Sequence, residues 1–220
     1  MSVLGKLRPL IDTTIAGLAK KKFVSDPIAG THYSGITSVV SSAYKRHGYI
    51  LERALLECLK ENPEFQVWTE PEFQVSQGAD QLVGTLTGNP QSAIGSNINY
   101  GPGVRALQTD IIVYDKINKT IRSYEIKRGS GKHDSGKRRQ ILRDTLCTQI
   151  LLHSYGQSLG LSISSSSSHV VFYYGMCSIG KPFSLTAAEL NAHFDYPVTS
   201  QLELVNAYFQ RRLLAVLAGV

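Results

Sequence analysis

Cysteine is scarce in this chain, and its spacing excludes several classes of protein. Only three of the 220 residues are cysteine, at Cys58, Cys147 and Cys177, and no Cys-x-x-Cys pair or Cys/His zinc pattern occurs. A disulfide-rich secreted scaffold and a zinc finger are therefore excluded. An odd number of widely spaced cysteines favours a reduced, cytoplasmic setting with buried thiols.

Long apolar runs are also missing. The first residues include Lys6, Arg8 and Asp12 and lead into the run Lys20–Lys22, so we expect neither a signal peptide nor a membrane span there. Elsewhere the apolar runs are far too short to cross a bilayer. The apolar content of 42% can nevertheless supply an ordinary core.

The order of the predicted elements indicates a single α/β unit. We expect an N-terminal helical extension over residues 1–35, a core over 36–177, and a C-terminal helical segment of the same domain over 178–220. Within the core, apolar periodicity predicts helices over 36–61 and 137–159.

Loops are expected where turn-forming and small polar residues gather. Residues 88–103 contain too many Gly, Asn, Pro and Ser for a regular element. Residues 162–168 are serine except for Ile163, which predicts a low-complexity linker before a strand over 169–175.

Charged residues interrupt two otherwise apolar segments that predict a β-hairpin. Residues 109–115 form a short apolar run, residues 120–127 alternate in polarity, and the four residues between them suit a hairpin connection.

The register of this hairpin brings three charged side chains together. If Asp115 pairs with Thr120, Asp110 falls opposite Glu125. Side chains alternate along a strand, so Glu125 and Lys127 share a face, and Asp110 joins them there. Two carboxylates and an ammonium at one point could bind a divalent metal and act on what it activates. An exposed cross-strand ion pair is the structural alternative.

The spacing of Asp110 and Glu125-Ile-Lys127 resembles the motif of the PD-(D/E)xK nuclease superfamily, which includes many restriction endonucleases, resolvases and repair exonucleases. Its signature is an aspartate at the start of one strand and acid-x-lysine on the next. Thr109 stands where the motif has a proline, one of its more variable elements. The resemblance covers about residues 36–177 and implies an α/β fold with a restriction-endonuclease-like core, a central mixed β-sheet flanked by α-helices.

The resemblance also implies roles for particular residues. Asp110 and Glu125 would hold Mg²⁺, or Mn²⁺ in its place, with the main-chain carbonyl of Ile126. Lys127 would orient the attacking water or stabilise the pentavalent phosphorane, and cleavage would leave a 3′ hydroxyl and a 5′ phosphate.

Many members of the superfamily add a glutamate on a preceding helix, four residues after a glycine. Gly48 and Glu52 match that pattern, so Glu52 is the expected further ligand. Glu57 lies on the same predicted helix and competes for the role. Both also have a simpler interpretation as surface acids of the helix.

A basic segment follows the predicted catalytic strand directly. Between positions 127 and 143 there are seven basic residues and one acid, Asp134, a net charge of +6 that equals the formal charge of the whole chain. Such a segment can neutralise the DNA backbone, although a solvated loop and helix end is the commoner role of a charge run. The predicted DNA-binding residues are Arg128, Lys132, Lys137, Arg138, Arg139 and Arg143.

The same segment contains an alternative motif. Residues 131–137 match the phosphate-binding pattern G-x-x-x-x-G-K, but Arg138 follows where that motif requires Ser or Thr. Further along, Gln149 is polar on an apolar helix face; it is either a hydrogen-bonded core residue or an accessory residue of the kind seen in some exonuclease-like relatives.

The sequence thus predicts a cytoplasmic, Mg²⁺-dependent deoxyribonuclease whose partner is DNA, most closely a restriction-type endonuclease. Repair exonuclease and junction resolvase remain open within the nuclease class, and a homodimer would suit cutting of both strands. A non-catalytic basic DNA-binding module and a nucleotide hydrolase are the alternatives outside that class.

Overall fold

The computed structural model describes residues 2–20 and 24–219. They form two compact units, one from Met1–Cys58 with Pro197–Val220 and one from Leu59–Tyr196. This division falls at other positions than the expected boundaries at residues 36 and 178. Lys21 and Lys22 of the N-terminal lysine run lie outside the described residues.

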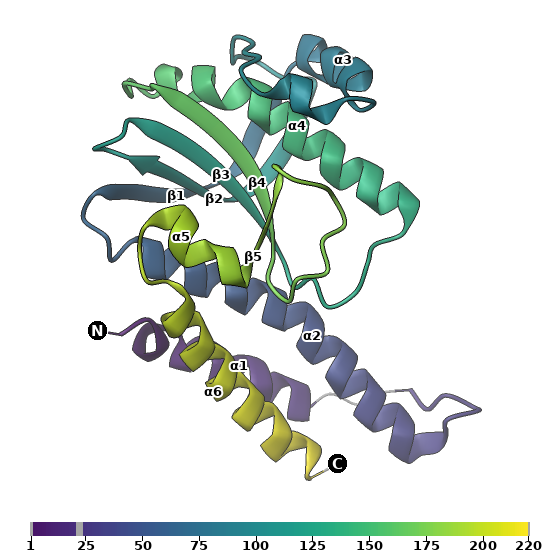
Figure 1. The fold of residues 1–220 in the computed structure, drawn as a ribbon. Helices are drawn as coiled ribbons and strands as arrows, with labels where there is room; N and C mark the ends of the chain where they lie inside the picture. Colours follow the sequence, from purple (N-terminus) through teal and green to yellow (C-terminus); the bar gives the residue numbers. More distant parts are fainter. Residues whose placement is uncertain (1, 21–23, 220) are drawn as a thin grey trace. The chain divides into compact units, whose positions relative to one another are not determined.

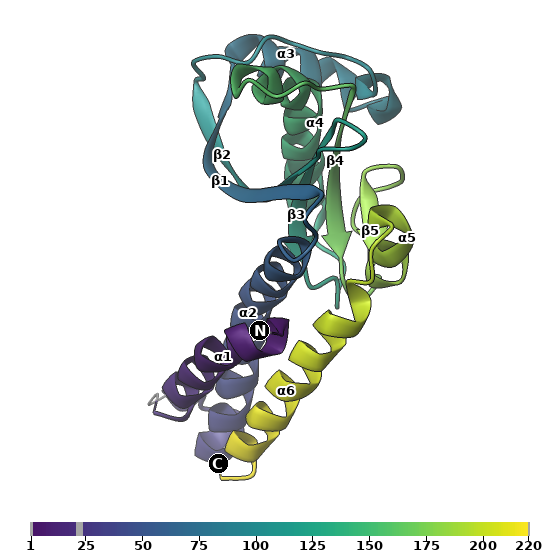
Figure 2. The same ribbon diagram turned by 90° about the vertical axis from the view of Figure 1, so that its left-hand side faces the viewer.

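The first unit consists of helices α1 (Val3–Ala19), α2 (Gly30–Leu59) and α6 (Thr199–Leu217). Ser2 caps α1 by accepting a hydrogen bond from the N–H of Gly5 at 3.2 Å. The three helices lie side by side (Figures 1 and 2). The helix expected over 36–61 is confirmed, although it begins earlier, and its apolar stripe is buried, as at Ala43, Ile50 and Leu51. Among the helices of the described residues, none is both long and apolar enough to cross a membrane.

The second unit is built on a mixed five-stranded sheet in the order β1-β2-β3-β4-β5. The pairs β1–β2 and β2–β3 are antiparallel, whereas β3–β4 and β4–β5 are parallel. The predicted α/β class, with a mixed sheet flanked by helices, is confirmed. The strands are β1 (Phe65–Val75), β2 (Arg105–Asp115), β3 (Thr120–Lys127), β4 (Ser165–Phe172) and β5 (Ser184–Thr186).

The predicted hairpin and its register are both present, since Asp115 pairs with Thr120. The turn explains why the hairpin closes here. One carboxylate oxygen of Asp115 accepts hydrogen bonds from the N–H groups of Ile117 and Asn118 at 3.0 and 2.9 Å. Lys119 then takes the left-handed conformation, with φ of 52°.

Helix α4 (Ser135–Ser158) lies across one face of the sheet, with α3 (Gln77–Leu86) beside it (Figure 1). Its predicted position is confirmed. Buried apolar residues from β1 to β4 and from α4 form the core on this face, among them Phe73, Ile112, Ile150 and Phe172. On the opposite face, α5 (Leu190–Phe194) places Phe194 against Tyr124, with ring centroids 5.1 Å apart. The two short 3-10 helices are η1 (Pro90–Ala93) and η2 (Ala187–Glu189).

The serine-rich segment is a strand, so its prediction as a linker was wrong. Residues 165–168 form the first half of β4 and pair in parallel with β3. Small side chains suit this position because the two strands carry short hydroxyls toward each other, with the Oγ atoms of Ser123 and Ser168 at 2.8 Å. Composition alone suggested a linker, whereas the parallel partner and the helix above it make the segment a strand.

Candidate active site

Asp110 lies where the main-chain pairing of β2 and β3 gives way to a side-chain contact. The paired positions run from Asp115–Thr120 to Ile111–Tyr124. At the next step, Oδ2 of Asp110 accepts a hydrogen bond from the main-chain N–H of Ile126 at 2.7 Å. The carboxylate is thereby fixed to the catalytic strand expected from the sequence, one residue from both Glu125 and Lys127.

Glu125 and Lys127 lie on the same face of β3, as predicted. Nζ of Lys127 is 2.5 Å from Oε1 of Glu125, and their side chains are 26% and 30% exposed, so solvent and a substrate can reach both. Ile121 lies on this same face of β3, and it belongs to the core beneath α4. The three charged residues of the motif are therefore brought together on the α4 side of the sheet.

The electrostatics of Asp110 reflect this crowding. Burial raises the pKa of its carboxyl, and the nearby charge of Glu125 raises it further, whereas the hydrogen bond from Ile126 and the charge of Lys127 lower it. The net direction is upward. A cation placed between the two carboxylates would relieve both the desolvation and the like-charge repulsion.

The donor set fits a hard divalent cation with two protein carboxylates. Mg²⁺ commonly binds through one or two carboxylates, keeps several waters and accepts substrate phosphate oxygens. Asp110 and Glu125 supply such a pair, and the carbonyl of Ile126 lies between Glu125 and Lys127 in the chain. Within residues 2–20 and 24–219, no group of three or more His, Cys, Asp or Glu side chains is arranged to hold a metal.

The two candidate glutamates of the preceding helix belong to the helical unit. Glu57 forms ion pairs with Lys6 and Arg53, at 3.4 and 3.8 Å. Glu52 lies on α2 and is partly exposed. Its role as a further ligand stays a prediction.

Glu125 also borders a small hollow between the sheet and α4 that sequence reasoning missed. Its walls include the side chains of Ser123, Asp144, Thr145 and Thr148. Asp144 is held in place by hydrogen bonds from Arg105 at 2.9 Å and from Gln140 at 2.8 Å. The i, i+4 spacing of Asp144 and Thr148 on a predicted helix was the available signal.

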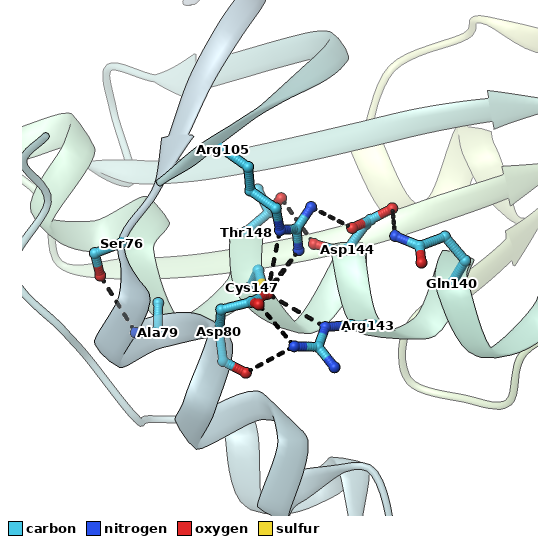
Figure 3. A network of polar contacts seen from close by, with 9 residues as sticks. All are labelled: Ser76, Ala79, Asp80, Arg105, Gln140, Arg143, Asp144, Cys147 and Thr148. Carbon is cyan, nitrogen blue, oxygen red and sulfur yellow. Dashed lines mark hydrogen bonds and ion pairs between the residues drawn. The ribbon is translucent and has the colours of Figure 1, made fainter. Parts of the chain in front are cut away.

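Part of the basic segment is neutralised within the protein. The guanidinium of Arg143 pairs with Asp80 at 2.7 Å, and Arg105 pairs with both Asp80 and Asp144 at 2.9 Å (Figure 3). The hydrogen bond from Arg143 is the largest cause that lowers the pKa of Asp80 to about 2. The sequence could not predict this network because Asp80 comes from α3, in a stretch without a predicted element.

The remaining basic residues are placed differently. The guanidinium of Arg128 lies over the ring of Tyr174, 5.4 Å from its centroid. Lys132, Lys137, Arg138 and Arg139 are exposed around the start of α4. For Arg138 and Arg139, no described residue provides an acidic partner.

The phosphate-loop pattern does not present free helix amides. Asp134 caps α4, and its carboxylate accepts the N–H of Lys137 at 2.9 Å. This hydrogen bond is the largest cause that lowers the pKa of Asp134. A carboxylate therefore occupies the place where a nucleotide phosphate would need donors.

Gln149 is a hydrogen-bonded core residue. It is buried, its Nε2 donates to the carbonyl of Ser166 at 3.3 Å, and its Oε1 accepts the N–H of Ser168 at 2.9 Å. Both ends of the amide thus hold the first half of β4 against α4.

Comparison of this chain with models of protein families, with curated proteins and with solved structures gave no match. The resemblance to the PD-(D/E)xK superfamily consequently depends on the residues and the geometry described above.

Proposed function

We propose that this protein is a metal-dependent deoxyribonuclease that hydrolyses phosphodiester bonds in DNA, with a restriction-type endonuclease as its closest description. The observation that carries the proposal is the convergence of Asp110, Glu125 and Lys127 on one partly exposed face of adjacent strands. The mixed sheet flanked by helices is compatible with the restriction-endonuclease-like core that the motif implies.

Each group has a chemical task that suits this reaction. Asp110 and Glu125 would hold Mg²⁺, with Ile126 supplying a carbonyl oxygen. When bound, the ion lowers the pKa of a coordinated water and offsets charge on the scissile phosphate. Lys127 has an ammonium within reach of the same point, where it can orient the water or stabilise charge that develops on the phosphate.

The basic start of α4 supports DNA as the substrate. Lys132, Lys137, Arg138 and Arg139 are exposed and follow the acidic pair in the chain. A polyanion bound by these side chains would be held beside the carboxylates, with an affinity that falls as salt rises.

Plasmid DNA incubated with Mg²⁺, with Ca²⁺ or with chelator tests the proposal. Cleavage should require Mg²⁺ and should be lost in Asp110→Asn and Lys127→Ala. Glu72→Gln, which changes an exposed carboxylate of β1, is the matched control and should cleave normally. Mg²⁺-dependent nicking that persists in both active-site variants would exclude this site. Cutting of closed circles separates an endonuclease from an exonuclease that needs a free end.

A non-catalytic DNA-binding module is the second candidate, and one observation favours it. Lys127 and Glu125 neutralise each other at 2.5 Å, as a purely structural ion pair would. Salt-sensitive DNA binding without cleavage of any circular, linear or branched substrate would support this alternative.

A further inference from the structure

A second, larger pocket opens beside the first turns of α4. Its volume is about 600 Å³, within the roughly 300–1,000 Å³ of small-molecule sites. Three segments of the same compact unit enclose it: residues 88–91, the start of α4 and residues 178–183. None of Asp110, Glu125 and Lys127 lines this pocket.

The pocket combines an apolar wall with positive charge. Leu142 supplies partly exposed apolar surface, whereas Ile179 and Phe183 line the same space but are only 9% and 3% exposed. Arg138 and Arg139 line the same space without an acidic partner among the described residues, and none of the lining residues is an acid. A ligand that suits these walls has a flat apolar part and an anionic part.

Polar residues able to form hydrogen bonds with the edge of a flat ring also line the pocket. Asn89 and Gln91 are among the lining residues, and the hydroxyl-bearing residue Ser135 lies at the start of α4. Carboxamides can pair with the edges of nucleobases, and arginines bind phosphates. A nucleotide therefore matches the pocket better than a simple anion or a purely apolar ligand.

The pocket is fixed to β3, the strand that carries Glu125 and Lys127. The chain beyond β3 pairs with the chain beyond β4, with hydrogen bonds from Tyr173 N–H to the Lys127 carbonyl at 2.9 Å and from Met176 N–H to the Gly129 carbonyl at 3.0 Å. Gly129 has φ of +65°, and a Cβ there would lie 2.8 Å from that of Phe172, so no larger residue fits. The strand exit is thus held in one conformation.

A second link joins the segment after β3 to the pocket wall. The Ser178 hydroxyl forms a hydrogen bond with Nδ1 of His133 at 2.8 Å. The same oxygen also accepts the main-chain N–H of His133 at 3.2 Å. The pocket and the Glu125–Lys127 pair both lie toward the carboxyl end of β3, the edge of an open α/β sheet where ligands usually bind.

We propose that this pocket receives an unpaired nucleotide of the DNA substrate, with Arg138 and Arg139 on its phosphates and the base against the partly exposed Leu142. The inference builds on the proposed function, because it assumes that the bound polymer is DNA. It assigns the substrate class as DNA with an extrahelical or single-stranded nucleotide near the cleaved bond. An unpaired base enters more readily than a paired one, because no base pair must be broken first.

Binding can be measured without the metal site. Two labelled duplexes, one fully paired and one with a single extrahelical 2-aminopurine, are titrated in buffer with chelator. The protein should prefer the second duplex by about tenfold, because an extrahelical base enters without the cost of breaking a base pair. The 2-aminopurine emission should change on binding, because the base moves from water to an apolar wall.

Two glycines allow the pocket to be filled from opposite sides. Gly88 and Gly180 both line the pocket, and a Cβ at either meets nothing within 4 Å, so Gly88→Phe and Gly180→Phe add a ring at the pocket lining without a clash at Cβ. Each should reduce the preference to within about twofold. Gly84→Phe is the control. Gly84 is exposed on α3, a Cβ there also meets nothing within 4 Å, and this variant should retain the preference. Thermal unfolding confirms that each variant is folded.

The outcomes separate this inference from the proposed function. Equal affinity for the two duplexes, or a preference that survives in both filled variants, would overturn the nucleotide pocket whether or not the protein cleaves DNA. A preference that disappears on filling would support the pocket even if no DNA were cleaved, in which case only the nuclease proposal would fail.

Discussion

Nζ of Lys127 lies 2.5 Å from Oε1 of Glu125, so the acid and the lysine of the motif form an ion pair with each other. A metal at Glu125 therefore competes with an ammonium already in contact with that carboxylate. This gives Lys127 two opposed effects, one on metal affinity and one on catalysis, which a single substitution can separate.

Lys127→Ala should bind Mg²⁺ more tightly and cleave DNA more slowly. Loss of the neighbouring positive charge frees Glu125, and a partly exposed pair of this kind contributes up to about 1 kcal/mol, or about fivefold in affinity. Loss of a group that stabilises transition-state charge should slow cleavage about 10²–10³-fold. Calorimetric titration with Mg²⁺ and single-turnover cleavage measure the two effects. Weaker Mg²⁺ binding in this variant would contradict the expected competition.

Asp110→Asn should remove the stabilisation of the protein by Mg²⁺. The amide oxygen of asparagine can still accept the Ile126 N–H, so the hairpin should fold, but the charge that binds the ion is lost. At an Mg²⁺ concentration about 100 times its Kd, binding should stabilise the wild type by about 2.7 kcal/mol. Thermal unfolding with and without Mg²⁺ measures this difference. Glu72→Gln should respond as the wild type does; an equal response in Asp110→Asn would show that the ion binds elsewhere.

The arginines of the basic segment should contribute unequally to DNA binding. Arg138→Gln and Arg139→Gln should each lower affinity and reduce the slope of log affinity against log salt by about 0.9, the effect of one lost phosphate contact. Arg143→Gln should leave that slope nearly unchanged, because its guanidinium is paired with Asp80 (Figure 3). Anisotropy titrations at several salt concentrations compare the three. A decrease of the slope by about 0.9 in Arg143→Gln as well would mean that DNA displaces Asp80 from the Arg143 guanidinium.

Local pattern was sufficient to predict the hairpin, and long-range packing decided the rest. The apolar strand and the Asp115 turn are encoded within a few residues, so the register and the Glu125–Lys127 contact followed from spacing. The serine-rich half of β4 could not be predicted, because its order comes from β3 and from Gln149 across the helix interface. Composition carries no information about such partners.

The ion-pair network was likewise beyond the sequence. Asp80 lies 63 positions from Arg143 along the chain, and the two meet only because α3 packs beside α4. The sequence therefore shows that Arg143 is charged, but it could not show that Asp80 is its partner. The role of Glu52 stays a prediction, since Glu52 and Asp110 belong to different compact units.

Asp80→Asn should destabilise the fold. Asp80 accepts from both Arg105 and Arg143, and its side chain is 25% exposed, so we expect a loss of about 1–2 kcal/mol after solvent screening. Because the folded pKa of about 2 lies below the ordinary aspartate pKa of 3.8, this stabilisation is present above pH 3.8 and is lost as the pH falls through about 2. Urea unfolding at pH 7 measures the loss. Arg212→Ala, which breaks a more exposed pair with Asp12, is the comparison and should cost less than about 1 kcal/mol.

Stability should also fall between pH 7 and pH 5, because of two histidines on the face of the sheet opposite α4. Burial lowers the pKa of His169 from 6.5 to about 4 and that of His193 from 6.5 to about 3, and their rings lie 4.9 Å apart beside Tyr124. Below pH 6.5 the unfolded chain gains protons that the folded protein excludes, so the free energy of unfolding decreases until the folded pKa values are reached; above pH 6.5 this dependence vanishes.

His169 alone should account for about 2 kcal/mol of that decrease between pH 7 and pH 5. Urea unfolding across this range measures the slope, and His169→Gln should reduce it by about half because one of the two excluded protons is no longer involved. His153→Gln, on α4 in the same compact unit, is the control. The contact between Tyr124 and His193, at 2.8 Å, should persist in both variants, so a change of slope would report protonation rather than a collapsed cluster. An unchanged slope in His169→Gln would show that the folded protein admits the proton at this site.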